Sequence, residues 1–98
     1  EGRTDDVLEF PNQRILFPDF IRRTVIAAHP DIVNYQVIQE SPSKLALFVS
    51  PAVHWEVASE ALAELLQSQD MTGVQIEMLE NKRHERGSKF RRIYAKRH

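Results

Sequence analysis

The sequence predicts an α+β domain in which two helices cover one face of an antiparallel sheet. Short apolar or alternating runs separated by turn residues indicate strands, and two longer stretches carry apolar residues at helical spacing. A length of 98 residues with 42% hydrophobic content suits one compact unit, so residues 1–98 are treated as a single domain.

The first half of the chain predicts a hairpin followed by a helix. Residues 7–10 and 14–17 are expected to be short strands around PNQ, a turn sequence. The helix begins in FPDFIRRTVIAAHP, and Pro30 ends it. Its apolar face is expected to consist of residues at spacings of three, four and seven: Phe20, Ile21, Thr24, Val25 and Ala28.

The second half predicts a hairpin, a helix and a last strand. VNYQVIQ and KLALFV flank the turn cluster ESPS and indicate an antiparallel hairpin. Ser50 and Pro51 suit the N-cap and first turn of a helix, and Asp70 and Gly73 mark its end. Its predicted apolar stripe is Val57, Ala58, Ala61, Leu62, Leu65 and Leu66, with Glu56, Glu60 and Glu64 outside it. VQIEML is expected to be a strand with one face formed by Val74, Ile76 and Met78.

With residues 14–17 as the first strand of the sheet, the order is β-α-β-β-α-β. This order predicts a ferredoxin-like sandwich preceded by a short hinge strand or hairpin. The architecture hosts ligand sensors, RNA binders and parts of enzymes, so it does not define a function.

Charge is segregated along the chain. Residues 1–80 hold five Lys and Arg against thirteen Asp and Glu, whereas residues 81–98 hold eight Lys and Arg against Glu85 alone. Such a basic tail suggests an anionic partner, which is a phosphate, a nucleotide, a nucleic acid or an acidic protein face; the alternative is a solvated tail. We expect the tail to bury little, because its large apolar residues are only Phe90, Ile93 and Tyr94.

Several classes of site lack their usual residue patterns. Cysteine is absent, and His29, His54, His84 and His98 form no short ligand pair, so we expect no metal. The serines lie in no nucleophile motif, and three glycines do not form a phosphate loop. No apolar run reaches the roughly 18 residues of a membrane span, so we expect a cytoplasmic protein with no membrane partner.

Four motifs together resemble a known family. GRTDD, FPDFI, YQVIQ and GSKFRRI are similar in order and spacing to the C-terminal domain of phenylacetate-CoA ligase-like adenylate-forming enzymes, over essentially the whole chain. The resemblance implies a small mobile lid on an N-terminal domain of the same chain that binds ATP, Mg²⁺ and an aromatic or other organic acid. The lid closes for acyl-adenylate formation and rotates for thioester formation with CoA. It implies an ATP-dependent acid–CoA ligase-like enzyme, in which the isolated lid is inactive.

The resemblance also implies three residue roles. Asp5 matches the hinge aspartate within residues 1–6, and Arg3 matches the arginine that contacts the ribose and phosphates of the nucleotide. Lys89, in the basic tail 81–98, matches the lysine that enters the active site during adenylation. A compact ammonium on a flexible stem suits this step, because a carboxylate attacking the α-phosphate brings two anions together.

Two departures from the family pattern concern the acceptor and the lysine loop. PNQR stands where the family has an Arg-Gly pair lining the pantetheine tunnel, so three acceptors stay open: CoA, a carrier protein or none. Ser88 separates Gly87 from Lys89, where the family has glycine directly before the lysine.

The chief alternative is a free-standing ferredoxin-like module that binds RNA or a regulatory ligand with its basic tail. A structural adaptor without a ligand is a third interpretation. Sheet-surface RNA binders need exposed aromatic residues, but Tyr35 and Phe48 are isolated and expected to pack in the core or at its rim. The acidic body would also repel a phosphate backbone, so we expect no nucleic acid partner.

Overall fold

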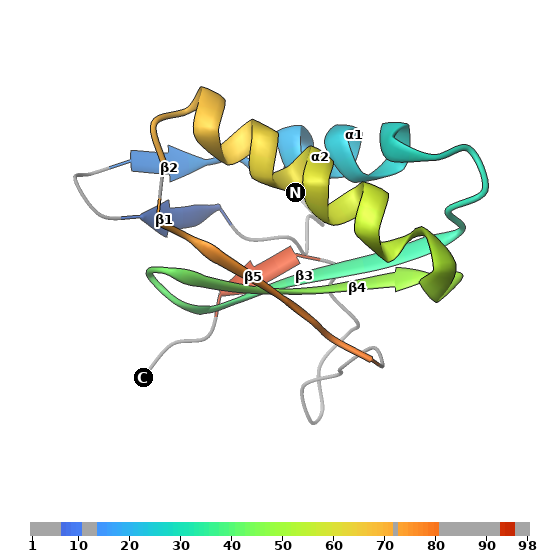
Figure 1. Cartoon of the computed structure of the whole chain (residues 1–98). Helices are drawn as coiled ribbons and strands as arrows, with labels where there is room; N and C mark the ends of the chain where they lie inside the picture. Colours follow the sequence, from blue (N-terminus) through green and yellow to red (C-terminus); the bar gives the residue numbers. More distant parts are fainter. Residues whose placement is uncertain (1–6, 11–13, 72, 81–92, 96–98) are drawn as a thin grey trace, which may run out of the picture.

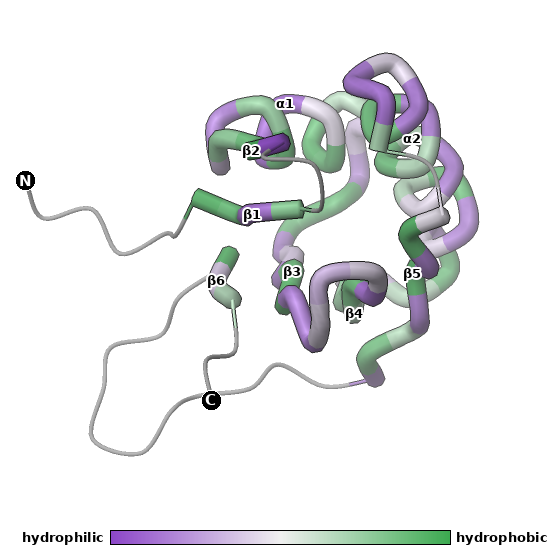
Figure 2. The backbone as a smooth tube through the Cα atoms, turned by 90° about the vertical axis from the view of Figure 1, so that its left-hand side faces the viewer, coloured by the Kyte–Doolittle hydropathy of each residue, from purple (hydrophilic) through white to green (hydrophobic). Residues whose placement is uncertain are grey.

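The computed structural model describes residues 7–10, 14–71, 73–80 and 93–95. These residues form an α+β domain with a two-stranded sheet, a four-stranded mixed sheet and two α-helices (Figure 1). Figure 2 shows both helices and the two-stranded sheet on the same side of the larger sheet. Within this described part, neither helix combines the length and the apolar character needed to cross a lipid bilayer.

The predicted N-terminal hairpin is confirmed. Strand β1 (Leu8–Phe10) pairs antiparallel with β2 (Arg14–Leu16), with Leu8 opposite Leu16 and Phe10 opposite Arg14. Leu8, Phe10 and Leu16 are buried, whereas Glu9 is exposed. This alternation fixes which face of the hairpin packs on the domain, because successive residues of a strand point to opposite sides.

The larger sheet has the strand order β5-β4-β3-β6. The predicted central hairpin is confirmed: β3 (Asn34–Ser41) pairs antiparallel with β4 (Lys44–Ser50), with a register shift between Gln39 and Ser41. Strand β5 (Gln75–Met78) lies parallel to β4, and β6 (Ile93–Ala95) lies parallel to β3.

The strand pairing differs from the predicted ferredoxin-like order, which is not confirmed. Among the described strands, β2 pairs with β1 in the small sheet, although residues 14–17 were expected to be the first strand of the main sheet. The edge of β3 is instead taken by β6, which comes from the basic segment 81–98. That segment buries more than expected, because Ile93 is fully buried and Tyr94 is 5% exposed.

Helix α1 (Pro18–Ala28) begins and ends where the sequence predicts. Proline fits its first turn because the first N–H groups of a helix have no intrahelical acceptor, and the helix ends two residues before Pro30. Ile21 and Val25 are buried as expected. The expectation that Phe20 belongs to the buried face is wrong, because Phe20 is 46% exposed. The centre of its ring lies 5.7 Å from the guanidinium carbon of Arg23.

Helix α2 (Trp55–Ser68) follows a short 3-10 helix, η2 (Ala52–His54). The predicted role of Ser50 as N-cap is wrong, because Ser50 ends β4 and Pro51 precedes the 3-10 turn without a side-chain cap. Ala58, Leu62 and Leu66 form the buried stripe of α2, while Val57 is 37% exposed. The three glutamates of the outer face are exposed as predicted: Glu56, Glu60 and Glu64.

The end of α2 at Asp70 and Gly73 is confirmed by their backbone angles. Asp70 has φ 63° and Gly73 has φ 84°, both in the left-handed region. The amide of Met71 donates to the carbonyl of Leu66 at 2.8 Å, and the amide of Asp70 donates to that of Gln67 at 3.1 Å. These two bonds define a Schellman motif, with Met71 packed in the same apolar cluster as Leu66.

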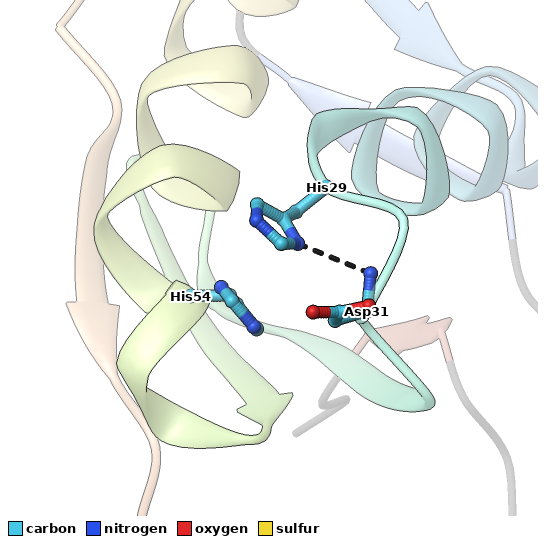
Figure 3. Close-up of side chains that lie close together, drawn as sticks. All are labelled: His29, Asp31 and His54. Carbon is cyan, nitrogen blue, oxygen red and sulfur yellow. Dashed lines mark hydrogen bonds between the residues drawn. The ribbon is translucent and has the colours of Figure 1, made fainter.

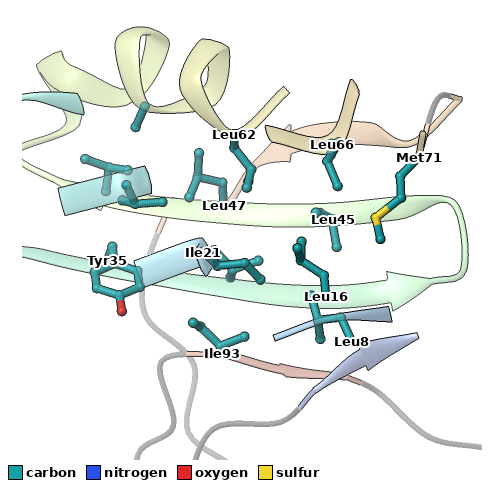
Figure 4. Close-up of a cluster of buried hydrophobic side chains, with 14 of the residues drawn as sticks. Leu8, Leu16, Ile21, Tyr35, Leu45, Leu47, Leu62, Leu66, Met71 and Ile93 are labelled. Atoms are coloured by element: carbon teal, nitrogen blue, oxygen red, sulfur yellow. The ribbon is translucent and has the colours of Figure 1, made fainter. Parts of the chain in front are cut away.

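Apolar side chains cover both faces of the β3–β4 hairpin. The main core lies between the helices, the small hairpin and one sheet face, and it includes Val37, Leu45 and Leu47 (Figure 4). A smaller cluster on the other face contains Ile38, Ala46, Leu79 and Tyr94, with Phe48 packed against it. Ile76 of β5 and Val74, just before this strand, are half-buried as predicted for one face, but Met78 is 52% exposed. Apolar side chains thus pack on both faces of this hairpin, and for this reason the residues of β3 form an almost continuous buried run.

Candidate functional site

The three residues assigned by the family resemblance lie outside the described part of the structure. Arg3 and Asp5 belong to residues 1–6, and Lys89 belongs to residues 81–92. The described residues nearest to them in the chain are Val7, which precedes β1, and Ile93, which begins β6. These two strands therefore show where the predicted hinge and lysine segments join the domain.

Both joining strands are attached to β3. Val37 and Gln39 of β3 pair with Ile93 and Ala95 of β6. The Gln39 side chain also donates a hydrogen bond from Nε2 to the backbone carbonyl of Glu9 in β1, at 2.8 Å. Gln39 is only 5% exposed, whereas Glu9 is exposed, so this bond is partly buried. One buried glutamine thus links the N-terminal hairpin to the strand that holds β6.

The cationic side chains of the described residues lie against acidic or aromatic partners. Three of the four Lys and Arg residues in these ranges are in exposed ion pairs, at 3.3–3.6 Å: Arg14–Asp70, Arg22–Asp19 and Lys44–Glu77. The fourth, Arg23, lies over Phe20. Exposed pairs contribute about 0–1 kcal/mol to stability, but they lower the positive potential available to a phosphate. Anion binding by the basic segment 81–98 stays a prediction, because most of that segment lies outside the described residues.

A hollow of about 410 Å³ opens beside η2, between the ends of β4 and β5. Its shape is fixed by Trp55, whose Nε1 donates to the carbonyl of Leu47 at 2.8 Å. It is lined by Phe48, Val49, Ser50, Ala52, Trp55, Met78, Leu79 and Glu80. Among the described residues, Glu80 is the only ionisable one that lines it, so these residues offer apolar contact and one carboxylate but no acid–base pair.

A second group of polar side chains lies at the junction between α1 and α2. The rings of His29 and His54 stack with centroids 3.8 Å apart and an angle of 21° between their planes. One ligand atom from each of His29, Asp31 and His54 lies within 4.8 Å of the others. The Asp31 amide donates to Nδ1 of His29 at 3.1 Å (Figure 3). Both imidazoles are half-buried, and the carboxylate is exposed.

The sequence argument against metal ligands did not find this group, because the two histidines are 25 positions apart. The predicted central hairpin contained the missing signal. Asn34 at the start of β3 pairs with Ser50 at the end of β4, so the segment before one strand and the segment after the other must be neighbours. His29 and His54 lie in those two segments.

Comparison of the chain with models of protein families, with curated proteins and with solved structures found no match.

Proposed function

We propose that the chain is the C-terminal lid domain of a phenylacetate-CoA ligase-like, adenylate-forming enzyme. The observation that carries the proposal is the order and spacing of four motifs over the whole chain: GRTDD, FPDFI, YQVIQ and GSKFRRI. The proposal does not require a ferredoxin-like strand order, since it depends only on a compact domain that carries both a hinge segment and a lysine segment.

The attachment to β3 of the strands that follow these two segments supports the proposal. A lid that turns as one body must hold its hinge and its catalytic loop on a common rigid element. Here β1 follows the hinge segment and accepts a hydrogen bond from the Gln39 side chain of β3. Strand β6 follows the lysine segment and pairs with the backbone of residues 37–39 of β3. A rotation about residues 1–6 would therefore carry β6, the strand that follows the lysine segment, with the sheet.

In the proposed reaction each of the three residues has a separate task. Asp5 absorbs the change in backbone angles between the two poses of the lid, and Arg3 contacts the ribose and phosphates of the nucleotide. Lys89 places its ammonium between the attacking carboxylate and the α-phosphate, where it stabilises the charge that develops in the transition state. ATP, Mg²⁺ and the organic acid are held by the N-terminal domain. CoA, a carrier protein or no acceptor takes the acyl group afterwards.

The RNA-binding alternative has less support from the described sheet. Its aromatic residues are Tyr35 and Tyr94, which are 2% and 5% exposed, and Phe48, which is half-buried. Base stacking on a sheet surface needs aromatic faces that a base can reach.

The test is Lys89→Ala in the full-length enzyme. A positioned charge in the transition state contributes roughly 3–4 kcal/mol, so acyl-adenylate formation should slow by about a hundred- to a thousandfold. The second half-reaction from supplied adenylate, where it occurs, should be spared.

Lys82→Ala and Lys96→Ala are matched controls, because each removes one ammonium from the same segment 81–98. Both should retain adenylation within a few-fold of the unmodified enzyme. Equal losses in all three variants would show a diffuse electrostatic effect and would refute the assignment of one catalytic lysine.

A further inference from the structure

We propose that His29, Asp31 and His54 form a binding site for a divalent transition-metal ion, and that this ion is Zn²⁺. This inference is independent of the proposed function, because it uses none of the residues in the hinge or the lysine segment. It rests on the convergence of three ligand atoms within 4.8 Å and on the backbone that holds their positions.

The backbone around the three residues is tied together by hydrogen bonds. The amide of Val33 donates to the carbonyl of Ser50 at 2.9 Å, which joins the segment before β3 to the segment after β4. The amide of His54 donates to the carbonyl of Pro51 at 3.1 Å within the 3-10 turn. Pro30 restricts the backbone between the first two ligands, since its ring fixes φ. The three side chains therefore start from positions that the fold fixes.

Two imidazoles and one carboxylate are a common ligand set for zinc. Zn–N and Zn–O distances are about 2.0–2.2 Å, so tetrahedral ligand atoms lie about 3.3 Å apart. Ligand atoms within 4.8 Å of one another must approach by up to about 1.5 Å, a movement that side-chain torsions provide. Imidazole nitrogens suit Zn²⁺, Cu²⁺ and Ni²⁺, whereas Mg²⁺ prefers oxygen ligands.

Metal binding requires one ring to turn out of the stack. A metal lies in the plane of each imidazole that binds it, but the planes of His29 and His54 are nearly parallel, at 21°. The lone pair on His29 Nδ1 already points to the Asp31 side, where it accepts the backbone N–H (Figure 3). A metal at this nitrogen replaces one hydrogen bond at the exposed residue Asp31, and water can satisfy the released N–H. Rotation of the His54 ring then completes the set.

Three protein ligands leave a fourth tetrahedral position for water or another small ligand. The exposed carboxylate of Asp31 keeps this position open to solvent. The bound ion would also join the end of α1 to the start of α2, so metal binding should stabilise the fold.

The first test is calorimetric titration of ZnCl₂ into metal-free protein at about pH 7.5. We expect one ion per chain with a Kd tighter than about 100 μM, and proton competition should weaken binding at about pH 5. Asp31→Asn, at an exposed position, and His54→Ala should each weaken binding at least about tenfold. The control is the double variant His84→Ala/His98→Ala, which removes the other two imidazoles of the chain and should bind zinc unchanged. No binding, or binding that the control abolishes and Asp31→Asn does not, would overturn the proposal.

The second test is thermal unfolding, which reports the link between the two helices. At a hundredfold excess over Kd, zinc should raise Tm by about 10–20 °C, and MgCl₂ at the same concentration should not. Ring proton resonances of His29 and His54 should shift together on zinc addition, because the stack opens. A calorimetric signal without the rise in Tm, or without shifts in both rings, would place zinc elsewhere on the chain and refute this site.

Discussion

Replacement of Gln39 by leucine should loosen the N-terminal hairpin from the sheet. The substitution keeps a side chain of similar size at a position that is 5% exposed, but it removes the Nε2 donor that bonds the Glu9 carbonyl at 2.8 Å. Loss of one hydrogen bond costs about 0.5–1.5 kcal/mol, and an acceptor left partly buried without a partner adds a cost at the lower end of about 1–3 kcal/mol. Leucine regains part of this by apolar burial, so we expect a net loss of about 1–2 kcal/mol.

Urea denaturation measures this loss, and a Tm lower by about 4–16 °C should accompany it. Amide hydrogen exchange locates it: protection should fall more in the β1–β2 ladder than in the β3–β4 ladder. Gln75→Leu is the matched control, since Gln75 is an exposed glutamine of strand β5 and its replacement should change stability by less than about 0.5 kcal/mol. A Gln39→Leu variant as stable as this control, with unchanged exchange in β1, would refute the link.

Further substitutions test the core, the helix end and the hinge. Leu62→Ala should lower the free energy of unfolding by about 2–5 kcal/mol, because Leu62 is fully buried, whereas Val53→Ala at an 81% exposed site should change it by less than about 0.5 kcal/mol. Asp70→Gly should be more stable than Asp70→Ala by about 1 kcal/mol, since φ is 63° there, glycine adopts this conformation freely and both variants lack the ion pair with Arg14; equal stability of the two in urea denaturation would count against the reasoning. In the full-length enzyme, Asp5→Pro should affect adenylation and thioester formation unequally by fixing φ, and equal loss of both in a folded protein would argue against a hinge.

Local patterns predicted the elements well because each depends on nearby residues. The turn ESPS and the alternation on either side of it were sufficient for the β3–β4 hairpin. The positive φ angles of Asp70 and Gly73 agree with residue types that tolerate them. Phe20 was misplaced because helical spacing gives a face but not the width of its contact with the core.

Strand pairing was harder to predict, because it depends on residues far apart in the sequence. Strand β6 has only three residues within a strongly basic segment, so its length does not indicate a strand even though isoleucine and tyrosine favour one. Its pairing with β3 is stabilised by burial of Ile93 and Tyr94. The cluster of His29 and His54 also depends on strand pairing. The spacing of the two histidines along the chain argued against a site, whereas the register of the β3–β4 hairpin brings their two segments together. The assignments of Arg3 to nucleotide binding, Asp5 to the hinge and Lys89 to catalysis stay predictions.

Strand β6 covers an edge of the β3–β4 hairpin that would otherwise be open. Along residues 37–39 it occupies the hydrogen-bonding edge of β3, a strand whose side chains at Val37 and Ile38 are fully buried. A chain lacking residues 93–95 would present that edge as a row of unpaired N–H and C=O groups beside an uncovered apolar surface. Such an edge is a template for pairing with a second copy, so we expect removal of β6 to favour aggregation.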